Sequence, residues 1–65
     1  MITIGNIDKF NNTLAIYALS TDVKPLETIK FKGVDYRVTN ASTFYEIDTK
    51  KTTMFDEENR IWYDV

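Results

Sequence analysis

The sequence predicts an all-β fold, a small antiparallel β-meander sandwich or partly open barrel built from hairpins. Short runs of β-branched and aromatic residues recur along the chain, and these residue types favour strands. Turn formers such as Asp, Asn and Gly separate the runs at short intervals. With only two glycines and one proline, residues 1–65 are expected to form one ordered domain rather than a disordered tail.

The clearest predicted element is a hairpin over residues 28–39. Gly33 supplies a permissive turn position. With Lys32 and Gly33 as a two-residue loop, Phe31 pairs with Val34. The apolar side chains then share one face and the charged side chains the other, as in a hairpin with one solvated side.

Residues 42–65 predict a meander of three short strands joined by two turns. A three-residue first loop would place Ile47 opposite Lys51, and a five-residue second loop would place Phe55 opposite Ile61. These loop lengths fix the register of the whole meander.

That register assigns every meander side chain to a face, because side chains alternate along a strand. One face would carry Tyr45, Ile47, Thr53, Phe55, Ile61, Tyr63 and Val65. The other would carry Phe44, Glu46, Met54 and Trp62. On the second face Phe44, Met54 and Trp62 would form a row across three strands. One face can cover the protein's own core, so the other needs a second cover.

The row has two interpretations. It is either core, covered by the rest of the chain, or a protein interface, since Trp, Tyr and Met are enriched where proteins meet. In the second interpretation the contact residues are Phe44, Tyr45, Met54, Trp62 and Tyr63. The exposure of Trp62 distinguishes the two.

The first part of the chain allows two interpretations. Residues 13–19 form a nearly continuous apolar run, whose length suits a strand buried on both faces. A helix over residues 7–19 is the alternative, because apolar residues recur there at three- and four-residue spacing, although weak helix formers lie in its middle. Residues 1–4 are expected to form a short strand ended by Gly5, and residues 20–25 a loop.

Length and composition suggest that the protein needs a partner. A chain of 65 residues buries only about 60% of the surface that it exposes when unfolded. Small domains often add disulfides or metals, but this chain has neither cysteine nor histidine. Self-association or docking is therefore expected.

No motif of catalysis or cofactor binding is recognisable. The common catalytic triads require a histidine or cysteine, and the isolated Gly5 and Gly33 form no phosphate-binding loop. The carboxylates of residues 56–58 lack the spacing of a calcium loop. We therefore expect no enzymatic activity, no cofactor, no metal and no small-molecule substrate.

Charge and hydropathy argue against two other partner classes. The net charge is −2 and the eight basic residues are dispersed, so no basic stripe for nucleic acid is present. No apolar run reaches the ~18–20 residues that span a bilayer, and the first residues do not resemble a signal peptide. Synthesis and retention in the cytoplasm of the producing cell are expected.

Two stretches carry a resemblance to a known class of proteins. They are Leu-Ser-Thr-Asp-Val-Lys-Pro at residues 19–25 and Ser-Thr-Phe-Tyr-Glu-Ile-Asp-Thr-Lys-Lys at residues 42–51, followed by Met54, Phe55 and Asp56 and by Trp62 and Tyr63. Together they resemble small proteins encoded in the head and tail assembly gene clusters of tailed bacteriophages. In those proteins Ser-Thr-Asp-x-Lys-Pro precedes Thr-Phe-Tyr-Glu-x-Asp-Thr-Gly-Lys, an aromatic-Asp pair and a Trp.

The resemblance, which covers about half of the chain, implies a non-enzymatic structural protein of the virion. A small head-decoration, fibre or fibre-attachment subunit, made in the host cytoplasm and contacting other virion proteins or itself, would fit. This chain departs from the pattern at Lys50, where the family usually has glycine, and a left-handed lysine costs on the order of 1 kcal/mol. It also inserts the hairpin of residues 30–38.

The alternative function is a phage-encoded inhibitor that binds a host defence protein or enzyme. Such a protein could present a patch of carboxylates to its target. The candidate residues for that patch are Asp56, Glu57, Glu58 and Asp64.

Overall fold

The computed structural model describes residues 2–65, and within that range it contains strands and no helix. The all-β prediction is confirmed. The strands are β1 (Thr3–Asp8), β2 (Thr13–Ala18), β3 (Thr28–Phe31), β4 (Val34–Arg37), β5 (Thr43–Glu46), β6 (Lys51–Asp56) and β7 (Ile61–Asp64).

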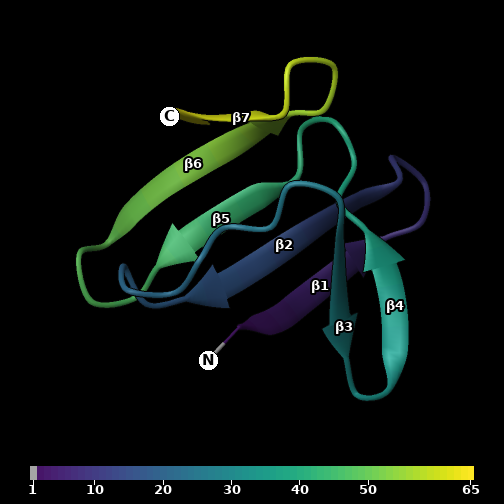
Figure 1. The fold of residues 1–65 in the computed structure, drawn as a ribbon, viewed down its shortest axis with the longest axis horizontal. Coiled ribbons are helices and arrows are strands. Elements are labelled where there is room, and N and C mark those ends of the chain that lie inside the picture. The colour runs from purple at the N-terminus through teal and green to yellow at the C-terminus, as the bar shows by residue number, and fades with distance from the viewer. Residues whose placement is uncertain (1) are drawn as a thin grey trace.

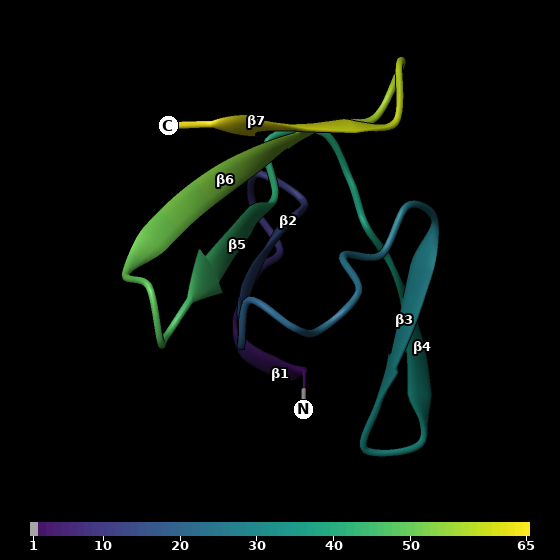
Figure 2. The ribbon, with the colours of Figure 1, turned by 60° about the vertical axis from the view of Figure 1, so that its left-hand side comes forward.

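The strands form two sheets (Figure 1). The larger has the order β1-β2-β5-β6-β7, and the smaller is the β3-β4 hairpin. Neighbours are antiparallel except β2 and β5, which are parallel. A parallel pair requires a crossover, and here the segment between β2 and β5 supplies it and includes the hairpin. The hairpin stands apart from the large sheet as a second layer (Figure 2). The large sheet ends at β1 and β7 and does not close into a barrel.

The core lies on the inner face of the large sheet, the face turned toward the crossover. Its buried apolar residues are Ile4, Leu14, Ile16, Ala18, Ile29, Val38, Phe44 and Phe55. The strand interpretation of residues 13–19 is therefore right and the helix alternative wrong. Burial on both faces is not observed, since Leu14 and Ile16 are buried while Tyr17 is 40% exposed.

β1 is longer than the predicted strand over residues 1–4, of which residue 1 lies outside the described part. The strand passes through Gly5, and its pairing with β2 is irregular between Ile4 and Asn6. A Cβ at Gly5 would lie 1.8 Å from Cε2 of Tyr17. Gly5 therefore does not end the strand; it makes room for the Tyr17 ring to lie across β1.

The predicted hairpin of residues 28–39 is confirmed with its register. Phe31 pairs with Val34 in the structure. Lys32 and Gly33 have φ of 52° and 78°, and two positive values are what a tight two-residue hairpin loop requires. Ile29 is buried, so one face of the hairpin covers the core.

The meander pairs as predicted, but both of its predicted registers are wrong by one residue. Glu46, not Ile47, faces Lys51. Likewise Asp56, not Phe55, faces Ile61. Both loops therefore have four residues instead of three and five.

The reason is the conformation of the last residue in each loop. Lys50 and Arg60 have φ of 60° and 55°, and Asn12 in the loop between β1 and β2 has φ of 57°. A left-handed residue turns the chain back into the next strand. The expected strain at Lys50 is thus present.

Two of these loops also share one hydrogen-bond pattern. Asp56 Oδ1 accepts from the backbone N–H of Asn59, whose side-chain amide donates to Asp56 Oδ2 over 2.9 Å. Asp8 and Asn11 form the same pair of contacts in the first loop. The shared Asp-x-x-Asn spacing was the available signal for four-residue loops.

In the observed register Phe44, Met54 and Trp62 do not form the predicted row on one face. Phe44 and Trp62 stay together on the inner face, where Phe55 pairs with Trp62. Met54 lies on the opposite, outer face across from Tyr63. The large sheet still has apolar side chains on both faces, but they are distributed between the two faces differently from the prediction.

Candidate protein-docking face

The outer face of the large sheet is the surface that no other part of the described chain covers. Alternation from the buried residues places on it Thr13, Ala15 and Tyr17 of β2, Thr43 and Tyr45 of β5, Thr52 and Met54 of β6, and Ile61 and Tyr63 of β7. The hairpin and the crossover lie on the other side (Figure 2). We call these nine residues the docking face.

Large apolar side chains are exposed across the docking face. The exposed fractions are 40% for Tyr17, 41% for Met54 and 52% for Tyr63. Tyr17 and Tyr45 face each other across the parallel pair, with ring centroids 6.2 Å apart at 83°. Edge-to-face pairs of this kind stabilise their own arrangement by ~0.5–1.5 kcal/mol, so the centre of the face is preorganised.

The nine residues of the docking face are uncharged, but Asp8 and Asp56, which pair with Thr13 and Ile61, lie on the same side of the sheet. Asp56, at the end of β6, lies at its margin, and its carboxylate is held by its own loop. The side-chain hydrogen bond from Asn59 lowers the pKa of Asp56. Exposed apolar patches of this kind mark places where proteins meet.

The predicted contact residues divide between the two faces. Tyr45, Met54 and Tyr63 belong to the docking face. Phe44 is fully buried on the inner face. Trp62 is half-buried and packs against the core. Tyr17 was missed, because its contact with Tyr45 depends on a parallel pairing between distant segments.

Trp62 has the environment of a core residue. Its ring lies 5.7 Å from that of Phe44 and 4.8 Å from that of Phe55, centroid to centroid. Its indole N–H donates to the carbonyl oxygen of Pro25 over 2.9 Å. Of the two interpretations of Trp62, the structure supports the core.

The segment of residues 19–25 is fastened to the loop after β5. Ser20 donates through its backbone N–H and its hydroxyl to the two carboxylate oxygens of Asp48, at 2.9 and 2.6 Å. Lys24 Nζ lies 2.8 Å from Oε2 of Glu46. Both contacts join the segment of residues 19–25 to the segment of residues 42–51, so these residues hold the crossover in place.

The carboxylates of this fastening have lowered pKa values. For Glu46, which is buried, the hydrogen bond from Lys24 is the main cause and the one from Thr49 the second. For Asp48, the hydroxyl of Ser20 is the main cause. Both groups are therefore held in the charged state.

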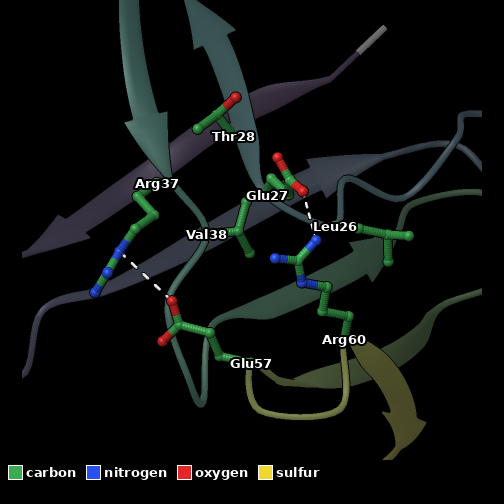
Figure 3. A pocket seen from close by; sticks show the side chains of 7 residues that line it. All are labelled: Leu26, Glu27, Thr28, Arg37, Val38, Glu57 and Arg60. Carbon is green, nitrogen blue, oxygen red and sulfur yellow. Dashed lines mark hydrogen bonds and ion pairs between the residues drawn. The ribbon is translucent and has the colours of Figure 1, made fainter.

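A pocket of about 310 Å³ lies between the hairpin and the loop after β6 (Figure 3). Its lining residues are Leu26, Glu27, Thr28, Arg37, Val38, Glu57 and Arg60. Arg37 Nε lies 3.5 Å from Oε2 of Glu57, and Arg60 pairs with Glu27. The cationic side chains of the pocket are thus already paired with carboxylates, and these pairs tie the hairpin to the meander.

The carboxylate patch considered for an inhibitor is partly neutralised within the chain. Glu57 pairs with Arg37, and Asp64 Oδ2 lies 3.2 Å from Nζ of Lys51. Within residues 2–65, no group of acidic side chains is arranged to hold a metal ion. The same range contains no helix of the length and apolarity needed to cross a membrane.

No protein-family model matches this chain, and neither a curated protein nor a solved structure matches it.

Proposed function

We propose that the protein is a non-enzymatic structural subunit that attaches to a larger protein through its docking face. The resemblance of its two sequence stretches suggests the setting: the particle of a tailed bacteriophage, where it would serve as a head-decoration, fibre or fibre-attachment subunit. Its partners would be other virion proteins.

The observation that carries the proposal is the aromatic outer face of the sheet, which has charges only at its margins, at Asp8 and Asp56, and lies opposite a covered face. Interface cores are enriched in tyrosine and methionine and depleted of lysine and glutamate. The docking face has this composition: Tyr17, Tyr45, Met54 and Tyr63 lie in it, and it contains no lysine or glutamate. Its threonines add hydroxyl groups that can hydrogen-bond to a partner.

The size of the face argues for attachment in many copies. The four strands that carry the docking face, spaced ~4.8 Å apart and each ~15–20 Å long, give a footprint of roughly 350 Å². A stable interface buries about 800 Å² on each partner. A single copy would therefore bind weakly, and an array whose copies support each other would bind much more firmly.

Mass spectrometry of purified particles tests the proposal. The particles come from the phage whose genome carries the gene, and the amount of this protein is compared with that of the major capsid protein. We expect a fixed copy number that survives repeated purification. Absence from particles, with the protein abundant in the infected cell, would contradict the proposal and favour the inhibitor.

A further inference from the structure

β7 is an edge strand whose outward backbone groups have no neighbouring strand in the described part of the chain. The N–H of Val65 donates to the carbonyl oxygen of Thr52 on β6 over 3.1 Å. Because bonding direction alternates along an antiparallel strand, Tyr63 and Ile61 also turn toward β6. The N–H and C=O groups of Trp62 and Asp64 therefore point away from it.

The two edges of the large sheet are not equally protected. β1 is irregular at Gly5, and such bulges discourage further pairing. β7 consists of Ile61, Trp62, Tyr63 and Asp64, so it has no bulge, proline, glycine or lysine. It is the edge that is ready to accept another strand.

We propose that β7 pairs with β7 of a second copy of this chain, antiparallel, with Tyr63 facing Tyr63 of the second copy. In this register the backbone N–H and C=O groups of Trp62 form hydrogen bonds with those of Asp64 of the second copy. Trp62 and Asp64 are the residues whose backbone groups point outward. Ile61 would face Val65, and both are exposed, by 45% and 80%. The strand is thus complementary to itself.

A neighbouring two-fold register that is also compatible with the alternation is centred on Trp62. It would pair Asp64 with Arg60 of the second copy. Arg60 has φ of 55°, a left-handed conformation that cannot continue a strand. Of these two registers, the one centred on Tyr63 forms two complete hydrogen-bonded residue pairs.

Pairing at β7 would also enlarge the docking face. A two-fold axis perpendicular to the sheet leaves both outer faces on the same side, so that Met54 and Tyr63 of each copy form one continuous surface. The footprint would double to roughly 700 Å², close to the size that a stable interface uses. The pairing rests on β7 alone and does not depend on the proposed attachment to a particle.

Single cysteines test both the dimer and its register, because the chain has no cysteine of its own. Facing residues that are not hydrogen-bonded lie ~4.5 Å apart at Cα, within reach of a disulfide. Tyr63→Cys should form a disulfide-linked dimer under mild oxidation. Ile61→Cys is the matched control: it lies on the same face at similar exposure, but ~13 Å from its equivalent in the second copy.

A second pair of variants tests the backbone contact in solution. Asp64→Pro removes an N–H that points outward and leaves the bonds to β6 intact. Asp64→Asn removes the same carboxylate but keeps the N–H. By analytical ultracentrifugation we expect the dimer dissociation constant to rise roughly tenfold or more for Asp64→Pro, and to change little for Asp64→Asn. Circular dichroism confirms that each variant is folded.

A concentration-dependent dimer in the unmodified chain, with cross-linking at position 63 and not at position 61, would support the pairing. A strictly monomeric chain at high micromolar concentration would overturn it, and so would equal cross-linking at both positions. Should Asp64→Pro fail to fold, the cysteine pair still decides. Loss of the dimer with retention on particles would overturn this pairing alone and leave the proposed function standing.

Discussion

The indole N–H of Trp62 and the carbonyl oxygen of Pro25, far apart in the sequence, meet at 2.9 Å. This hydrogen bond closes the crossover over the aromatic cluster of Phe44 and Phe55. It links the last strand of the meander to the loop before the hairpin, and thereby helps to hold the two layers together.

Trp62→Ala should therefore destabilise the fold. Removing a large aromatic from packed surroundings costs about 3–5 kcal/mol, a large share of the stability of a domain this small. Trp62→Phe keeps a ring against Phe44 and loses the hydrogen bond, at about 1 kcal/mol. Urea melts followed by circular dichroism measure both. Unchanged stability of Trp62→Ala would contradict the placement of this side chain.

Acid should weaken the fold through the carboxylates that fasten the crossover. Glu46 and Asp48 have pKa values below their ordinary values of 4.5 and 3.8. The unfolded chain therefore takes up protons first as the pH falls, so their contribution to stability is complete above pH 4.5 and is lost as the pH falls through the folded pKa values.

Glu46→Gln isolates one part of this acid response. The glutamine side chain cannot ionise, so the urea midpoint of the variant should be lower than that of the parent protein near neutrality. The midpoint should also fall less steeply as the pH is lowered. Thr49 can still donate to the amide oxygen, which makes the change a test of the charge. Parallel pH curves for the parent and the variant would count against a role for the Lys24–Glu46 pair.

Lys50→Gly should stabilise the protein. Lys50 has φ of 60°, a conformation that costs a residue with a Cβ roughly 1 kcal/mol and costs glycine nothing. Lys51→Gly is the control, because Lys51 belongs to β6 and glycine weakens a strand. The urea midpoint should rise for Lys50→Gly and fall for Lys51→Gly. A drop in both would show that the loop is not strained.

Gly5→Ala should disturb the docking face by displacing the ring of Tyr17, which packs over Gly5. The added Cβ would overlap the ring of Tyr17, which must then move and so disturb its contact with Tyr45. We expect a loss of about 1–3 kcal/mol. In a Tyr17→Ala background the same change should cost much less, and this difference measures the coupling. Equal costs in both backgrounds would mean that the ring does not lie over Gly5.

The fold could be predicted correctly where the residue types in a loop indicate how many residues the loop contains. Lys32 and Gly33 indicate a two-residue loop in the hairpin, and the predicted register of the hairpin is right. The loop after Glu46 was misjudged because a left-handed residue at Lys50, although expected, does not by itself fix the number of residues in the loop. Each error of one residue moved the side chains to the wrong face, which is why Met54 was placed beside Trp62.

The docking face could be predicted only in part. Met54 and Tyr63 come from neighbouring strands of one meander, so local pairing brings them together. Tyr17 reaches Tyr45 through a parallel pairing with a long crossover, and local patterns do not reveal which distant strands pair. The sequence did indicate that one sheet face would need a second cover.

The most direct test of the docking face compares Met54→Glu with Val23→Glu in a particle-retention assay. Both side chains are exposed apolar groups, but only Met54 lies on the docking face. We expect both variants to be folded, Val23→Glu to be retained like the unmodified protein, and Met54→Glu to bind particles more weakly by about 2 kcal/mol or more. Equal retention of the two variants would contradict the account.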